Sequence, residues 1–390
     1  MLARQCIRLG LVMLASVALS ACATWPERPE IRAELVPSAQ VPGFERARLW
    51  SDAAREEWER WRAISRVQRY KAGRFDAYEI LAISSGSDKG AFSAGFLNGW
   101  SKAGNRPEFD IVSGVSTGAL IAPFAFLGSG YDAHLTTLYT GIEAHHIYKA
   151  RPIGGLLGGA ALADTQPLAD LIALYTDEEL LARIAAEHAK GRRLLVQTTN
   201  LDAERGVVWD MGAIASSKSA ERLTLFRRVL LASASIPGAF PPVLIRSQNG
   251  SSPLEELHVD GGTTSSLFAV PPAIVFESMP DRDPLTGRIT ILYNGALAPN
   301  YEVTKPRTFS ILERALSASI READRRSISA LNAFAEKNGI DIEVHPLGPT
   351  DEEEEEQEGL FDPAFMLKVY KKGEALGLMQ ASSAKALDAP

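Results

Sequence analysis

The chain has 390 residues, 46% of them hydrophobic, which is enough to bury a large core. Acidic residues outnumber lysine and arginine, and the net charge of −7 argues against nucleic acid as a partner. The two cysteines, Cys6 and Cys22, both lie near the N-terminus, which excludes a disulfide framework or a cysteine metal site in the main domain.

The N-terminus has the pattern of a secretory signal peptide. Arg4 and Arg8 precede an apolar run over residues 9–19 that is shorter than the about 20 residues of a membrane span. Leu19-Ser20-Ala21-Cys22 resembles the lipobox of bacterial lipoproteins, in which the cysteine is lipidated and becomes the mature N-terminus. We therefore expect a lipoprotein signal peptide over 1–21 and membrane attachment through Cys22. The implied location is a bacterial cell envelope, on the periplasmic side of the outer membrane; an ordinary signal peptide is the alternative.

Two short segments are expected before the main domain. Prolines among polar residues at 22–46 predict an extended tether. Residues 47–77 are expected to hold an amphipathic helix, in which Trp58 and Trp61 either face a membrane or dock on the domain; the glutamates around them favour docking. The main domain is then expected over 78–380, followed by a flexible tail over 381–390.

The main domain alternates apolar β-branched runs with helical patterns. The expected strands are 78–84, 111–112, 192–199, 206–210, 257–259, 288–293 and 340–344. The expected helices are 119–127, 219–232, 308–337 and 363–379. This alternation predicts one α/β domain with a largely parallel central sheet and helices on both faces.

One strand leads into Gly114-Val115-Ser116-Thr117-Gly118, a nucleophile-elbow pattern G-x-S-x-G. Such a turn aims the serine hydroxyl outward, and Gly114 and Gly118 leave room for the neighbouring backbone. The helix that follows directs its positive end toward a developing oxyanion. Ser116 is therefore the predicted nucleophile.

A second strand-turn-helix unit precedes the elbow. The turn over residues 84–90, with Ser85, Gly86 and Ser87 at its centre, predicts a cradle of backbone N–H groups at a helix N-terminus. Because neighbouring parallel strands end at the same edge, the two turns are expected side by side, where an oxyanion hole belongs.

Asp260 is the predicted base. It ends the short strand 257–259, and Gly261 and Gly262 then turn the chain sharply. A carboxylate can deprotonate a serine only if it is partly desolvated and directly hydrogen-bonded to the hydroxyl. On spacing alone, a simple turn is the alternative.

Four blocks resemble, in chain order, those of patatin-like phospholipases. They are residues 85–90, 114–118, 234–242 and 260–262. The resemblance implies a patatin-like three-layer sandwich, a Ser116–Asp260 dyad and an oxyanion hole at Ser85, Gly86 and Ser87. That family usually has glycine where Ser85 and Ser87 stand here.

These observations predict a serine acyl hydrolase of lipid esters, of the phospholipase A or lysophospholipase type, that needs no metal or organic cofactor. One alternative is an α/β-hydrolase-like esterase in which His345 completes a Ser116-Asp260-His345 triad. Another is an envelope lipoprotein that keeps the fold without catalysis. The glycine-rich loop 153–162 is expected to be either a flap over an acyl chain or a packed loop. The acidic run 351–356 is expected to be a solvated loop.

Overall fold

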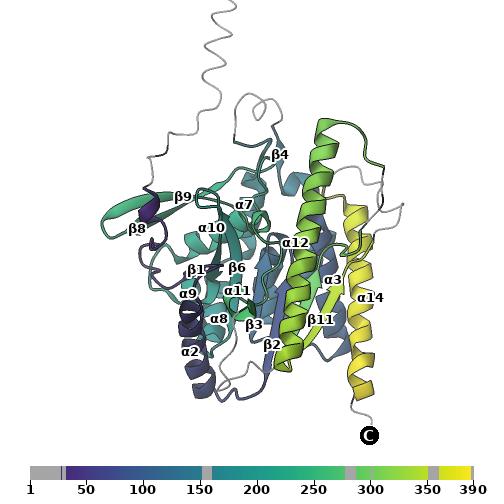
Figure 1. Ribbon diagram of the computed structural model, residues 1–390. Helices are drawn as coiled ribbons and strands as arrows, with labels where there is room; N and C mark the ends of the chain where they lie inside the picture. The colour runs from purple at the N-terminus through teal and green to yellow at the C-terminus, as the bar shows by residue number, and fades with distance from the viewer. Residues whose placement is uncertain are drawn as a thin grey trace, which may run out of the picture.

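The computed structural model describes residues 28, 32–151, 160–276, 287–299, 301, 303–349 and 360–387 (Figure 1). The predicted signal peptide, Cys22 and the acidic run lie outside these residues, as does most of the loop 153–162. None of the described helices is long and apolar enough to cross a membrane.

Nine of the described strands form one mixed sheet, and β4 and β5 form a separate hairpin. The path through the sheet is β1-β7-β6-β3-β2-β10-β11, and β9 pairs with both β6 and β8. The five strands from β6 to β11 along this path are mutually parallel. The strands are β1 (Arg48–Trp50), β2 (Tyr78–Ile83), β3 (Ile111–Val115), β4 (Lys149–Ala150), β5 (Ala163–Asp164), β6 (Arg193–Asn200), β7 (Arg205–Asp210), β8 (Val243–Asn249), β9 (Ser252–Asp260), β10 (Gly287–Tyr293) and β11 (Asp341–Pro346).

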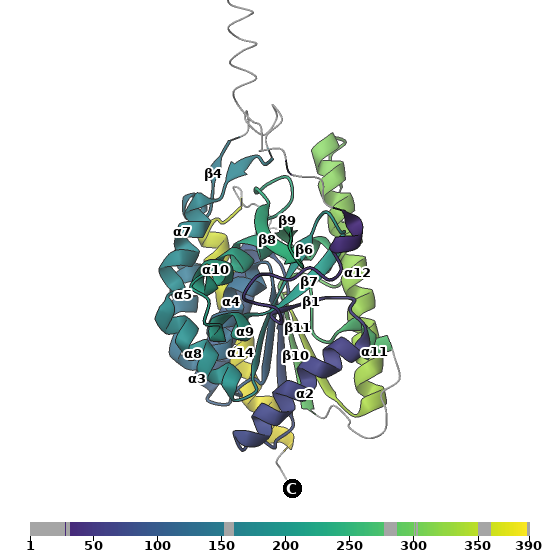
Figure 2. The same cartoon turned by 90° about the vertical axis from the view of Figure 1, so that its left-hand side faces the viewer.

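Helices cover both faces of this sheet, which gives a three-layer sandwich (Figures 1 and 2). One face carries α3 (Ala91–Ala103), α4 (Thr117–Leu127), α5 (Asp132–Thr140), α7 (Gln166–Tyr175), α8 (Glu178–Ala189), α9 (Met211–Ser216), α10 (Arg222–Ser233) and α14 (Pro363–Leu387). The other carries α2 (Arg55–Lys71), α11 (Pro272–Phe276) and α12 (Thr308–Asn338). Short 3₁₀ turns are η1 (Ala33–Leu35), η2 (Ser87–Gly90), η3 (Ser129–Tyr131), η4 (Ala144–His146) and η5 (Gly261–Thr263).

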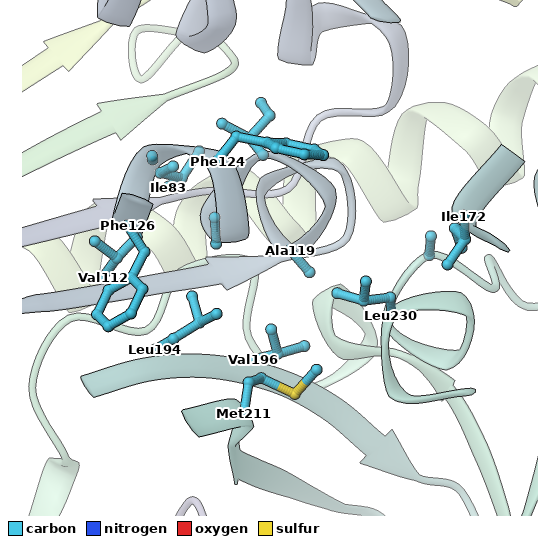
Figure 3. Close-up of a cluster of buried hydrophobic side chains, with 14 of the residues drawn as sticks. Ile83, Val112, Ala119, Phe124, Phe126, Ile172, Leu194, Val196, Met211 and Leu230 are labelled. Atoms are coloured by element: carbon cyan, nitrogen blue, oxygen red, sulfur yellow. The ribbon is translucent and has the colours of Figure 1, made fainter. Parts of the chain in front are cut away.

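The alternation of side chains along the strands separates the two cores. Leu81 packs into the larger core, whereas its neighbours Ile80 and Ala82 pack under α12, because successive residues of a strand point to opposite faces. In Figure 3, Val112 of β3 and Val196 of β6 lie on the side of the sheet where α4 and α10 contribute apolar side chains. The predicted fold class is confirmed.

Most of the expected strands and helices are present, with three corrections near the ends of the chain. The helix expected within 47–77 begins only at Arg55, because Arg48–Trp50 pairs with β7 as an edge strand. The predicted tether is too long: Val41 and Phe44 are already buried in the core. The last helix continues to Leu387, into the range that we expected to be a flexible tail.

The tryptophans of α2 dock on the domain. Trp58 is buried, with its ring centroid 5.6 Å from that of Trp61 and 5.8 Å from that of Phe268. Of the two predicted arrangements, docking on the domain is therefore confirmed, and the membrane-facing stripe is wrong for Trp58.

Candidate active site

Ser116 lies at the junction of β3 and α4, in a backbone conformation that non-glycine residues rarely adopt. Its φ is 57° and its ψ is −123°. This strain is held by tight backbone contacts around the elbow. A Cβ atom at Gly118 would lie 2.3 Å from the Ile83 carbonyl oxygen, and one at Gly114 would lie 2.2 Å from the Gly118 carbonyl oxygen. Both glycines are therefore required by close approach, as the sequence predicted.

The structure brings Ser116 and Asp260 together. The Ser116 hydroxyl donates a hydrogen bond to Asp260 Oδ2 over 2.6 Å, across 144 residues of sequence. Asp260 ends β9, where it stands opposite Thr198 of β6, and its Oδ1 accepts the Gly262 N–H at 2.7 Å. Both side chains are buried, with 5% exposed. One carboxylate oxygen is thus fixed by the turn and the other contacts the hydroxyl.

Burial changes the acidity of this carboxyl group. It raises the pKa of Asp260 to about 7, although the hydrogen bonds from Ser116 and Gly262 act in the opposite direction. A group with a pKa near neutrality can accept and return a proton at physiological pH.

Two serines that the sequence analysis did not single out support the pair. The Ser116 N–H donates to Ser233 Oγ at 3.0 Å, and the Ser233 hydroxyl donates to the Gln197 carbonyl at 2.7 Å. The Asp260 N–H donates to the Ser235 carbonyl at 2.9 Å. The C-terminal end of α10 therefore connects the elbow to the aspartate turn. Ser235 lies within the block at 234–242 and Ser233 lies directly before it, so that block was the sequence signal that could have indicated them.

The predicted oxyanion loop lies beside the elbow, because β2 and β3 are parallel neighbours. One of its three predicted donors is wrong: the Ser85 N–H donates to the Ser266 carbonyl at 2.8 Å and is therefore occupied. Within the described part of the chain, no hydrogen bond uses the N–H of Gly86 or Ser87. Ser87 has a φ of 55°, so it adopts the left-handed conformation that glycine favours.

Asn294, directly after β10, holds this loop from the other side. Its side-chain amide donates to the Ser84 carbonyl at 2.9 Å, and its backbone N–H donates to Ser84 Oγ at the same distance. A Cβ at Gly86 would lie 2.5 Å from Asn294 Cβ, so the loop tolerates only glycine there. Nothing in the local sequence around Asn294 indicates this contact.

The histidine of the alternative triad does not reach the pair. His345 lies on β11, and β2 and β10 separate that strand from β3. Its Nε2 lies 3.3 Å from Glu343 Oε2 and 3.1 Å from Gln380 Nε2, and its ring packs on Phe96. With strands about 4.8 Å apart, β11 is roughly 14 Å from the elbow strand. The structure contradicts a Ser116-Asp260-His345 triad.

A buried polar cluster supports β9 two to four residues before Asp260. The guanidinium of Arg48 makes two hydrogen bonds to the Glu256 carboxylate, at 2.6 and 2.8 Å. Glu256 Oε2 also lies 3.0 Å from His258 Nε2, and His258 Nδ1 lies 2.9 Å from Thr198 Oγ1. Thr198 Oγ1 also accepts a hydrogen bond from Trp209 Nε1 at 2.8 Å. Burial lowers the pKa of His258, which fits a neutral ring that donates to Glu256.

An apolar pocket begins at Thr117, the residue after Ser116. Its walls come from α4, α5 and α7, with Leu120, Tyr139 and Leu171 among the lining residues. A second apolar pocket lies under α2 against Ile80 and Ile111. Those two residues are near the amino ends of their strands, so that pocket is at the opposite edge from Ser116.

No group of three or more histidine, cysteine or acidic residues among the described residues is arranged to hold a metal ion. His145 lies 3.2 Å from Glu143, and its ring contacts that of His146.

Residues 81–273 match the model of the patatin-like phospholipase family. No curated protein sequence matches the chain. The crystal structure of VipD from Legionella pneumophila is similar with a TM-score of 0.41 and 15% identity, over 79% of this chain and 67% of that one. The family match includes both Ser116 and Asp260 and supports lipid hydrolase activity in general. The chain contains a patatin-like phospholipase domain over residues 81–273.

Proposed function

We propose that the chain is a serine acyl hydrolase of phospholipase A or lysophospholipase type, with Ser116 as nucleophile and Asp260 as base. The single observation that carries this proposal is the 2.6 Å hydrogen bond from the Ser116 hydroxyl to the buried Asp260 carboxylate, at a residue whose backbone has a positive φ. A serine becomes a nucleophile when an adjacent base takes its proton as it attacks.

The proposed reaction has two halves. Ser116 Oγ attacks the ester carbonyl carbon while its proton passes to Asp260, and the leaving alcohol then takes that proton as the acyl-enzyme forms. Water next attacks the acyl-enzyme, giving its proton to Asp260, which returns a proton to Ser116 as the fatty acid leaves. The N–H groups of Gly86 and Ser87 and the N-terminus of α4 are proposed to stabilise the oxyanion in both halves.

A fluorophosphonate probe tests the nucleophile directly. We expect the folded protein to be labelled covalently and Ser116→Ala not to be labelled. Asp260→Asn should lose ester hydrolysis by about 10³-fold or more, as expected for loss of a general base. His345→Ala is the matched control, because His345 contacts neither residue, and it should keep most of the activity. Labelled Ser116→Ala, or unlabelled folded wild type, would contradict the proposal.

The pocket beside Thr117 supports a long acyl chain as the group that enters the site. Its lining is mostly apolar and includes Thr117, the residue after Ser116, and we propose that the acyl chain of the substrate lies in it. Leu171→Trp should fill part of this space and lower kcat/KM for long acyl esters at least tenfold, with little effect on acetyl or butyryl esters. Leu174→Trp is the control on the same helix, because Leu174 is 73% exposed and lies outside the pocket. Equal loss for short and long esters would contradict this use of the pocket.

A further inference from the structure

The N-terminal half of α12 is an extended helix with very little packed against it. In residues 308–323, none of the side chains that the structure describes is buried, whereas Asp324, Ile328, Leu331, Phe334 and Ala335 of the second half all are. An isolated helix of this length is marginal in water, because most helical stability in proteins comes from packing of an apolar face. We therefore expect this half of α12 to be stabilised by contact with another surface.

Its position follows from one hydrogen bond. The Tyr293 hydroxyl, at the carboxyl end of β10, donates to Asp324 Oδ2 at 2.7 Å. Since α12 connects the carboxyl end of β10 to the amino end of the parallel strand β11, the sixteen residues before Asp324 lie on the carboxyl side of that contact. At 1.5 Å per residue they extend about 24 Å past the end of the strand. Figures 1 and 2 show this part of α12 rising beyond the sheet at the upper end of the molecule.

This projecting half carries apolar side chains into solvent. Ile311, Leu312, Leu316 and Ile320 are each 44–55% exposed. Leu312, Leu316 and Ile320 are four residues apart, so they form one stripe along the helix. Tyr301 and Val303, just before the helix, are more exposed still. A contiguous apolar stripe of this kind marks an interaction surface.

The charge around the stripe is opposite to that of the whole chain. Residues 303–326 contain six lysines and arginines against three acidic residues, one of which is the buried Asp324. Lys305 and Arg307 are exposed at the projecting end. A helix with a leucine and isoleucine stripe flanked by basic residues is typical of segments that lie in the interface of an anionic membrane.

The N-terminal segment brings this same edge toward a membrane if Cys22 is lipidated. Arg28 pairs with Asp202, in the turn that follows the carboxyl end of β6, and donates to the Glu255 carbonyl at 2.7 Å. Arg28 lies only six positions after Cys22, which limits the distance between them to about 20 Å. The carboxyl edge of the sheet, where Ser116 and the projecting half of α12 lie, would then face the bilayer.

We infer that residues 303–321 form a docking surface for an anionic lipid bilayer. The stripe of Leu312, Leu316 and Ile320 inserts at the boundary between headgroups and acyl chains, and the basic residues contact lipid phosphates. This goes beyond the proposed hydrolysis, because binding does not require Ser116 to react. The predicted lipidation of Cys22 supports the orientation of this surface toward the bilayer. The experiment below measures docking on a protein that lacks Cys22.

A single fluorescent label on α12 tests the inference. The test protein is the full chain with Cys6→Ala and Cys22→Ala, which removes both native thiols, and Ser116→Ala, which prevents hydrolysis. Leu316→Cys then carries an environment-sensitive dye. We expect a blue-shifted emission with vesicles of phosphatidylcholine and phosphatidylglycerol at low salt, and its loss at high salt. Ala189→Cys, exposed at the opposite edge of the sheet, is the matched control and should not shift.

Charge substitution gives a second measurement. Lys305→Gln with Arg307→Gln should weaken partitioning onto the anionic vesicles about 30-fold, since each basic residue near the surface contributes about a factor of five. Both positions are exposed, so the substitutions leave the fold intact. The inference is overturned if the dye at position 316 keeps its aqueous emission on protein that pellets with vesicles, or shifts equally with pure phosphatidylcholine. It is also overturned if the shift appears without vesicles and grows with protein concentration, which would assign the surface to a second copy of the chain.

Discussion

The Asp260 carboxyl group must be ionised to accept a proton from Ser116, yet it is buried, and burial favours its protonated form. Burial raises the pKa of its carboxyl group to about 7, so at pH 6 about nine molecules in ten hold a proton there. If Asp260 is the base, kcat/KM should reach a plateau near pH 8 and be roughly tenfold lower at pH 6. A pH–rate profile with short-chain esters measures this, and a profile flat from pH 5 to 8 would exclude Asp260 as the titrating base.

The same pKa makes Asp260 costly to the fold. Because its folded pKa lies above the unfolded value of about 3.9, its contribution to stability is present below pH 4 and is lost as the pH rises through 7. Asp260→Asn should therefore raise the free energy of unfolding at pH 8 by roughly 2–4 kcal/mol while abolishing hydrolysis. Denaturant titrations at pH 8 and pH 4 should show the gain only at pH 8. An equal gain at both pH values would point to a cause other than ionisation.

The strand β9 depends on a side chain from outside the matched family domain. Arg48, on β1, supplies the partner of the buried Glu256 carboxylate, and Asn200 adds a hydrogen bond to it at 3.1 Å. Burial opposes the ionisation of Glu256, but the guanidinium and His258 outweigh it and hold the pKa of the carboxyl group below its usual range. The N-terminal segment is thus part of the support for the strand that ends in Asp260.

Removing one partner of this pair should cost much more than removing a surface charge. Arg48→Met leaves the buried Glu256 carboxylate without its guanidinium partner, and breaking a buried ion pair in this way typically lowers the free energy of unfolding by about 3–5 kcal/mol. Arg183→Met is the control, because Arg183 pairs with Glu179 on the exposed face of α8 and its loss should leave stability unchanged. Chemical denaturation of the two variants compares them. Similar midpoints would mean that the Arg48–Glu256 pair does not stabilise the domain.

Across the whole molecule, the sequence predicted what local turn chemistry determines and missed what distant segments determine. Gly114, Gly118, Gly261 and Gly262 mark tight turns at strand ends, and parallel topology placed the turn at 84–90 beside the elbow. The meeting of Ser116 with Asp260 was predicted from the family resemblance, because β9, which ends in Asp260, runs antiparallel to its neighbour β6. The occupied Ser85 N–H could not be predicted, because its acceptor, Ser266, lies far along the chain. Whole-chain charge likewise concealed the basic residues around the apolar stripe of α12, since an average over 390 residues erases a local excess.

The predicted lipidation of Cys22 determines how the molecule would be oriented, because the short connection to Arg28 leaves little freedom. Metabolic labelling with an alkyne fatty acid should mark the wild-type chain and Cys6→Ser, and should fail on Cys22→Ser. Mass spectrometry of the mature protein should then find residue 22 at its N-terminus. Label retained in Cys22→Ser would show the lipobox prediction to be wrong, and the carboxyl edge of the sheet would lose its nearby anchor. Docking of α12 would then have to hold Ser116 at the bilayer by itself, and activity on anionic vesicles should fall steeply with salt.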